Sequence, residues 1–111
     1  MTKIEFYLND DDKLIGFEAK GHTGFGVQGE DLLCAGISLL TQSAVIGLSH
    51  FLSKDPVIDL RDGYLKCMVP DGISPDEMEN AQVILKTVLL ALEATKEDYG
   101  KFLSINKRRW S

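Results

Sequence analysis

The sequence predicts an α+β fold, a two-layer sandwich in which a mixed sheet of about five strands carries two helices in the order ββαββαβ. Three observations predict it. Short runs alternate apolar and polar residues, the segment 32–52 is apolar and free of formal charge, and a later segment repeats apolar residues every three or four positions. The chain has 111 residues and no repeats or low-complexity linker, so we expect a single domain over residues 1–111.

The first two strands are predicted to form a hairpin. Residues 3–8 alternate between apolar and polar side chains, with Ile4, Phe6 and Leu8 on one face. A turn-forming segment follows, and a second run carries Ile15, Phe17 and Ala19. One face of this hairpin should therefore be buried.

The next predicted element is a long apolar helix over about 32–52, with Asp31 as its N-cap. Its length is near that of a membrane span, but several Ser, Thr, Gln and His residues interrupt it, and alternating strands lie on both sides. We therefore expect no membrane partner. One side of the helix should pack on the sheet and another against a second copy, which predicts a homodimer.

A second hairpin is predicted after Pro56. Residues 57–60 and 64–69 flank the Asp-Gly pair at 62–63, which a tight two-residue turn favours. Cys67 shares a strand face with apolar neighbours, so we expect a core thiol there.

The second helix has a well-marked start. Ser74 is the expected N-cap, Pro75 suits the first helical position, and Glu77 completes a capping box. Gly100 is expected to end the helix in a left-handed conformation, before a last strand over 102–106. The helix should bury one apolar stripe, which consists of Met78, Ala81, Leu85, Val88 and Leu92.

The composition indicates which cellular compartment and which classes of binding partner to expect. The two cysteines lie far apart and no apolar leader follows Met1, which favours a reducing cytoplasm. The formal charge of −5 repels a phosphate backbone, and the one basic cluster is at 107–109. We expect no direct nucleic-acid partner, whereas a basic protein segment would be attracted.

The candidate active site lies between Gly21 and Ser38. Cys34 would occupy the third position of a helix capped by Asp31, where unpaired N–H groups and the helix dipole favour a thiolate. His22 is the candidate base. Asp31 could cap the helix or orient His22, and the sequence leaves both roles open. The pattern predicts a cysteine hydrolase.

The loop before the helix admits other interpretations. Residues 24–29 fit the GxGxxG pattern, but the acidic pair at 30–31 would repel a pyrophosphate, and no doubly wound βαβ array is present. The glycines more simply allow the loop to open and close over a cleft, with Phe25 contacting substrate. No paired Cys or His spacing suits zinc, so we expect no metal and no other cofactor.

The Gly21-His22 pair, a glycine-containing loop and the segment 31–38, which reads DLLCAGIS, resemble the motif of the ribosomal-processing cysteine protease family, Prp. The length, the element order and the apolar first helix also resemble that family, so the resemblance covers the whole chain. It implies a homodimeric endopeptidase that removes the N-terminal extension of a large-subunit ribosomal protein. The cut would fall after an aromatic pair and before a small residue, as a step in ribosome maturation.

The resemblance also assigns roles to residues. It implies that Cys34 is the nucleophile and His22 the base, and that Asp31 matches the family's acid. Ser38, one helical turn beyond the nucleophile, would line the substrate pocket, and we add Gly21 and Phe25 as substrate contacts.

Two functions from other classes remain open at this point. The chain could be a noncatalytic dimeric module that binds a peptide or assists ribosome assembly, with Cys34 present for packing. It could also serve redox chemistry or thiol transfer, although no resolving cysteine lies near Cys34 in the sequence. Much faster alkylation of Cys34 than of Cys67 would favour the protease.

Overall fold

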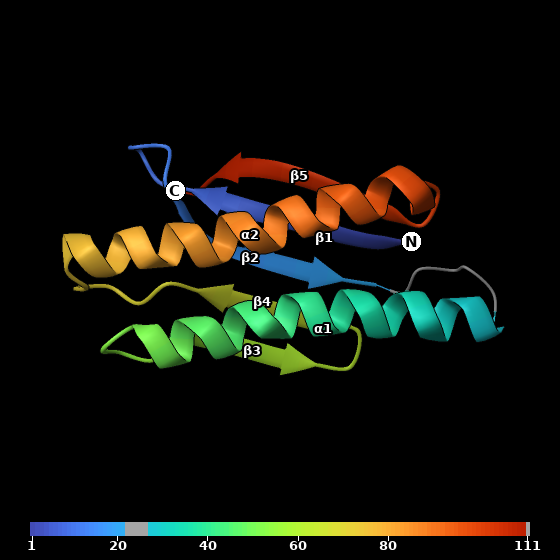
Figure 1. Cartoon of the computed structure of the whole chain (residues 1–111), viewed down its shortest axis with the longest axis horizontal. Helices are drawn as coiled ribbons and strands as arrows, with labels where there is room; N and C mark the ends of the chain where they lie inside the picture. The colour runs from blue at the N-terminus through green and yellow to red at the C-terminus, as the bar shows by residue number, and fades with distance from the viewer. Residues whose placement is uncertain (22–26, 111) are drawn as a thin grey trace.

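The computed structural model describes residues 1–21 and 27–110, apart from the side chains of 27–31. Five strands form one mixed sheet in the order β3-β4-β2-β1-β5, and two antiparallel helices lie side by side on one of its faces (Figure 1). The predicted fold class and element order are confirmed. The elements are β1 (Thr2–Leu8), β2 (Leu14–Lys20), α1 (Val27–Phe51), β3 (Val57–Arg61), β4 (Tyr64–Met68), α2 (Pro75–Tyr99) and β5 (Leu103–Arg109).

The hairpin of β1 and β2 places its apolar face under the helices, as expected. Phe6 lies opposite Phe17, both side chains are fully buried, and their ring centroids are 5.6 Å apart. An irregularity in the pairing shifts the register so that Leu8 lies opposite Leu14. Leu14 is therefore buried at the start of β2, and Ile15, expected on the buried face, is only half-buried.

Helix α1 begins earlier than the sequence indicated. It starts at Val27, so Asp31 lies in its second turn, and the expectation that Asp31 is the N-cap is wrong. The residues 27–30 carry no strong apolar period, and the prediction missed this amino-terminal turn for that reason.

One side of α1 packs on the sheet and on α2, whereas another side faces outward. Leu33, Ile37 and Leu48 are among its buried residues. Leu32, Leu39 and Ile46 are 78%, 74% and 69% exposed. The segment Leu32–Phe51 is long and apolar enough to cross a membrane, and 28% of its apolar window is buried within the chain.

The second hairpin and the second helix match their predictions closely. Gly63 adopts a φ of 68° in the turn between β3 and β4. Cys67 is fully buried, and burial raises the pKa of its thiol from 9.0 to about 12.

The capping box of Ser74 and Glu77 is present at the start of α2, and the Glu77 carboxylate also accepts hydrogen bonds from Ser53, which joins the end of α1 to the start of α2. The buried stripe of α2 consists of Ala81, Leu85, Val88, Leu89 and Leu92, whereas Met78, expected in it, is only half-buried.

The end of α2 differs from the expectation. Gly100 has φ −59° and ψ −20°, a right-handed conformation, so the expected left-handed C-cap is wrong. The chain instead continues through a turn in which the Phe102 N–H donates to the Tyr99 carbonyl at 2.9 Å. A left-handed reversal is therefore not needed to start the next strand.

Strand β5 is longer than predicted and pairs in parallel with β1. It includes the basic run at 107–109, which is part of the sheet edge rather than a tail. Trp110 follows it and stacks edge-on against Tyr7, with ring centroids 4.8 Å apart. The Trp110 N–H donates to the Leu8 carbonyl at 2.8 Å, which holds the carboxyl-terminal end on the sheet.

Candidate active site

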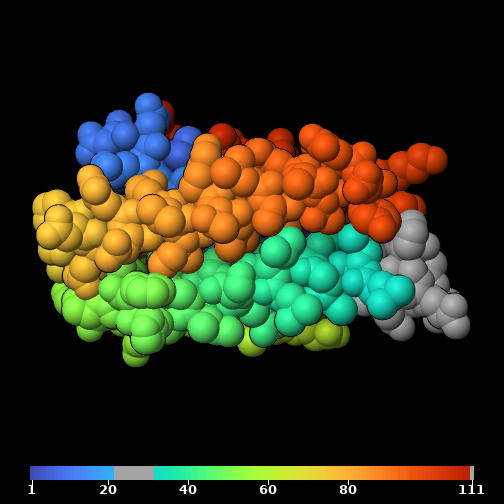
Figure 2. Space-filling view, viewed as in Figure 1, coloured from blue at the N-terminus to red at the C-terminus, as the bar shows by residue number. Residues whose placement is uncertain are grey.

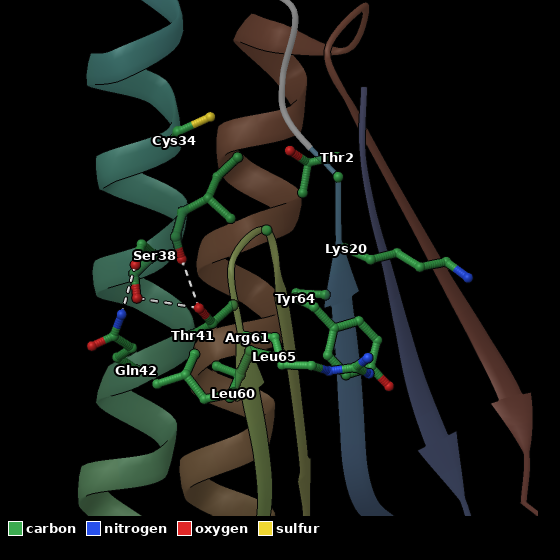
Figure 3. A pocket seen from close by; sticks show the side chains of 14 residues that line it. Thr2, Lys20, Cys34, Ser38, Thr41, Gln42, Leu60, Arg61, Tyr64 and Leu65 are labelled. Atoms are coloured by element: carbon green, nitrogen blue, oxygen red, sulfur yellow. Dashed lines mark hydrogen bonds between the residues drawn. The ribbon is translucent and has the colours of Figure 1, made fainter.

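A cavity of about 210 Å³ lies between α1, the end of β2 and the turn that joins β3 to β4 (Figure 3). Ile37 of α1 and Leu65 of β4 contribute apolar surface, and Leu60 of β3 closes one side. Polar groups surround this apolar surface. The cavity is therefore formed by segments that are distant in sequence and that the fold brings together.

Cys34 lines this cavity from α1. Its side chain is half-buried, and the sulfur points away from the helix axis toward the side of the cavity where Thr2 lies (Figure 3). Ser38, four residues later, lines the same cavity, and its hydroxyl accepts a hydrogen bond from the Gln42 amide at 2.7 Å; its contact with substrate stays a prediction. A partly shielded thiol thus lies beside a polar wall and an apolar floor.

The position of Cys34 within α1 corrects the expected electrostatics. Cys34 is the eighth residue of the helix, not the third, because α1 begins at Val27. The unpaired N–H groups of a helix lie in its first turn, and the influence of the helix dipole is strongest there. The start of α1 therefore supplies neither the thiolate stabilisation nor the oxyanion donors that a helix capped at Asp31 would have supplied.

Two predicted site residues, His22 and Phe25, lie outside the described residues, as does the side chain of Asp31. Gly21, the residue before His22, is described and lines the cavity. Its N–H donates to the Gly63 carbonyl at 2.9 Å, which ties the end of β2 to the β3–β4 turn.

The backbone at Gly21 requires glycine. Its φ is +95°, and a Cβ built there would lie 2.6 Å from the Met1 carbonyl oxygen. The fold therefore accounts for the glycine of the Gly-His pair on conformational grounds. A direct contact between Gly21 and substrate stays a prediction.

The wall opposite α1 contains residues that the sequence analysis missed. The Tyr64 hydroxyl donates to the Glu18 carboxylate at 2.8 Å, and this hydrogen bond is the main cause that raises the pKa of Tyr64. The Arg61 guanidinium lies 4.2 Å from the centroid of the Tyr64 ring and 3.2 Å from an oxygen of Asp59. The Asp-Gly turn signal identified this hairpin but not its position beside Cys34.

Within the part of the chain that the structure describes, no three His, Cys, Asp or Glu side chains are grouped as metal ligands would be. The expectation of no metal or other cofactor stays a prediction. The described arrangement, a thiol beside a mostly apolar cavity with a polar rim, suits nucleophilic attack on a bound substrate with an apolar side chain.

Comparison with known proteins gives a consistent result over the whole chain. The family model described as Cysteine protease Prp matches residues 1–104. The ribosomal processing cysteine protease Prp of Bacillus subtilis strain 168 is 29% identical over 107 residues, covering 95% of this chain and 96% of the relative. The protein of the same name from Staphylococcus aureus strain Mu50 is 28% identical over 108 residues, covering 96% and 98%.

Solved structures agree with these relatives. The crystal structure of the essential ribosomal processing protease Prp from S. aureus, in complex with a covalently linked product peptide, has a TM-score of 0.82 and 26% identity, covering 97% of this chain and 100% of that one. The crystal structure of SMU.848 from Streptococcus mutans has a TM-score of 0.79 and 25% identity, covering 99% and 96%.

Proposed function

Because the chain belongs to the Prp family of cysteine proteases, we propose that it removes the N-terminal extension of a large-subunit ribosomal protein, using Cys34 and His22 as a catalytic dyad. The observation that carries this proposal is the half-buried Cys34 thiol at a mostly apolar cavity, directly beside the segment that leads to His22. The curated relatives are named ribosomal processing proteases, and the S. aureus relative was crystallised with a substrate peptide as well as with a product peptide.

The chemistry follows from the two side chains. His22 takes the thiol proton of Cys34, and the sulfur attacks the scissile carbonyl to form a tetrahedral intermediate. The protonated imidazole then gives its proton to the leaving amine, which leaves an acyl group on the sulfur. Water, activated by the same imidazole, releases the acid product and restores the thiol. Asp31 precedes Cys34 by three residues in α1, and its role as an orienting acid belongs to the same proposal.

The shape of the cavity supports the expected sequence preference. Its volume of about 210 Å³ and its apolar floor of Ile37, Leu60 and Leu65 suit a single aromatic side chain. The hydroxyl of Ser38 and the Tyr64 ring lie at its rim. A peptide bond next to an aromatic residue bound there would lie near the Cys34 sulfur, consistent with cleavage after an aromatic residue.

We further propose that the protein acts as a cytoplasmic homodimer. Leu32, Leu39 and Ile46 recur at seven-residue intervals on the outward side of α1 and remain largely exposed. Leu32 and Leu39 line a groove of about 570 Å³, which Thr95 and Tyr99 of α2 bound on its other side. A second copy packed on this side would remove the apolar surface from water. Light scattering that finds only monomer at micromolar concentration would contradict the dimer.

A cleavage assay tests the proposed reaction. Purified protein is mixed with a peptide that spans an N-terminal extension of a large-subunit ribosomal protein and carries adjacent aromatic residues, and the products are identified by mass spectrometry. We expect one defined cut, and we expect Cys34→Ala and His22→Ala each to lower its rate by several orders of magnitude. Cys67→Ala is the matched control and should retain the cut. A cut that persists in Cys34→Ala would overturn the proposal.

A further inference from the structure

Strand β3 forms an exposed edge of the sheet that carries apolar side chains. All five of its residues are exposed, and Val57, Ile58 and Leu60 have 64%, 43% and 63% of their surface accessible. The opposite edge, β5, carries the basic run at 107–109, and charged edge residues discourage pairing with another strand. Edge β3 also carries charged residues, Asp59 and Arg61, but three of its five side chains are apolar, against two of seven in β5.

The pairing of the neighbouring strands fixes which backbone groups of β3 face outward. The Val69 N–H donates to the Ile15 carbonyl and the Gly21 N–H to the Gly63 carbonyl, so the odd-numbered residues of β4 bond toward β2. The even-numbered residues of β4 therefore bond toward β3, where their partners are residues 57, 59 and 61. The N–H and carbonyl groups of Ile58 and Leu60 then point away from β4, toward the open edge.

The side chains of Ile58 and Leu60 form an apolar shelf beside that edge. They lie opposite Cys67 and Leu65, which are buried under the helices, so they face the same side of the sheet. They nevertheless remain exposed, at 43% and 63%. Figure 2 shows atoms of the β3–β4 hairpin emerging along the lower edge of α1.

The shelf is continuous with the cavity that contains Cys34. Leu60 lines that cavity from β3, and Arg61, the last residue of the strand, forms part of its rim (Figure 3). A chain segment lying along the edge of β3 would therefore reach the cavity at the Leu60 end. This continuity favours a peptide substrate over other occupants of the edge.

We propose that the substrate peptide, whose existence rests on the proposed function, binds as an additional strand on the open edge of β3. Its backbone exchanges hydrogen bonds with Ile58 and Leu60, and it enters the cavity beside Leu60, close to the Cys34 sulfur. Every second peptide side chain rests on the shelf of Ile58 and Leu60. The backbone contacts hold the peptide irrespective of its sequence, and the cavity selects the residue at the cut.

The test uses peptides that carry one N-methylated amide at successive positions on either side of the cut. N-methylation removes one backbone donor, so kcat/KM should fall about tenfold at alternating positions along the segment on β3 and change little between them. Because methylation next to the scissile bond also disturbs the chemistry, positions two or more residues away carry the comparison. A uniform response, or none, in peptides that the unmodified enzyme cleaves would overturn the added strand.

A pair of variants tests whether the peptide binds along β3. Ile58→Pro removes an outward N–H, and proline is tolerated on edge strands when its nitrogen faces away from the paired neighbour. It should lower kcat/KM about tenfold, because the peptide carbonyl that this N–H faces loses its donor, and it should leave the methylation effect, which reports hydrogen bonds to the β3 carbonyls, in place. Ile58→Val keeps the donor and most of the apolar side chain, so its kcat/KM should be well above that of Ile58→Pro.

The remaining outcomes are also decisive. An unchanged kcat/KM in a folded Ile58→Pro variant would overturn the assignment to β3. Dissociation of a dimer by Ile58→Pro in light scattering would show that a second copy covers the edge and would also overturn it. If Ile58→Pro does not fold, as judged by circular dichroism, the methylation series with the unmodified enzyme decides alone. Failure of the unmodified enzyme to cut any peptide would instead refute the proposed function.

Discussion

The replacement Gly21→Ala should damage both stability and activity, because Gly21 combines an unusual backbone angle with a position at the cavity. Its φ of +95° lies in a region that costs a residue with a side chain about 1–2 kcal/mol. The added Cβ would lie 2.6 Å from the Met1 carbonyl oxygen, a backbone atom that cannot rotate away. Overpacking of this kind costs about 1–3 kcal/mol. Together these effects should lower the free energy of unfolding by about 2–5 kcal/mol.

Gly72→Ala is the matched control. Gly72 also has a positive φ, of +80°, but the nearest atom to its added Cβ is the Lys54 ammonium nitrogen at the end of a flexible side chain, and it does not line the cavity. We expect Gly72→Ala to lose only about 1–2 kcal/mol. Both variants are compared by urea denaturation and, under conditions where each is folded, by kcat/KM for the peptide.

We expect kcat/KM to fall by at least tenfold in Gly21→Ala and to stay within twofold of the unmodified enzyme in Gly72→Ala, because Gly21 lines the cavity and directly precedes His22 in the sequence, whereas Gly72 does neither. Equal losses of stability with unchanged kcat/KM in both variants would refute the argument that the conformation of Gly21 places the catalytic segment.

Three further results follow from the structure. The stability that the buried Cys67 thiol contributes is fully present below its ordinary pKa of 9.0 and is lost as the pH rises toward about 12, so urea denaturation should show an alkaline decline that Cys67→Ala makes shallower. Hydrogen bonds from Ser53 and Ser74 lower the pKa of Glu77 in the folded protein. The stability that the Glu77 carboxylate contributes is therefore present above its ordinary pKa and is lost as the pH falls through the lowered pKa. Glu77→Gln should reduce the acid dependence of the urea midpoint, and an unchanged dependence would contradict this account. A Cβ at Gly36 meets no atom within 4 Å, so Gly36→Ala should stabilise α1 by about 0.5–1 kcal/mol in the same assay, and destabilisation of the monomeric fold would show that this part of α1 packs differently.

Local signals in the sequence account for most of the fold. The capping box at Ser74, the Asp-Gly turn and the alternation around Phe6 each depend on residues within a few positions of one another, and each prediction is confirmed. Gly100 is of the residue type that favours a left-handed cap, but it adopts a right-handed conformation at the end of α2. The start of α1 was misplaced because Val27 and its neighbours carry no strong periodic signal.

The candidate site could be predicted only in part. The Gly-His pair and the segment around Cys34 are contiguous motifs, and the structure places Gly21, Cys34 and Ser38 around one cavity. Tyr64 and Arg61 reach the same cavity through the sheet order, in which β4 pairs with β2, and no local pattern encodes that pairing. The sequence therefore indicated the cysteine that lines the cavity but not the wall that faces it.

The measurement that tests the central claim most directly is stoichiometric alkylation of the native enzyme near neutral pH, followed by mass spectrometry of the labelled peptides and by the cleavage assay. The half-buried Cys34 should take up one equivalent of label, with peptide cleavage lost in proportion, whereas the fully buried Cys67 should stay unlabelled. Full labelling of Cys34 with cleavage retained would contradict its role as the nucleophile.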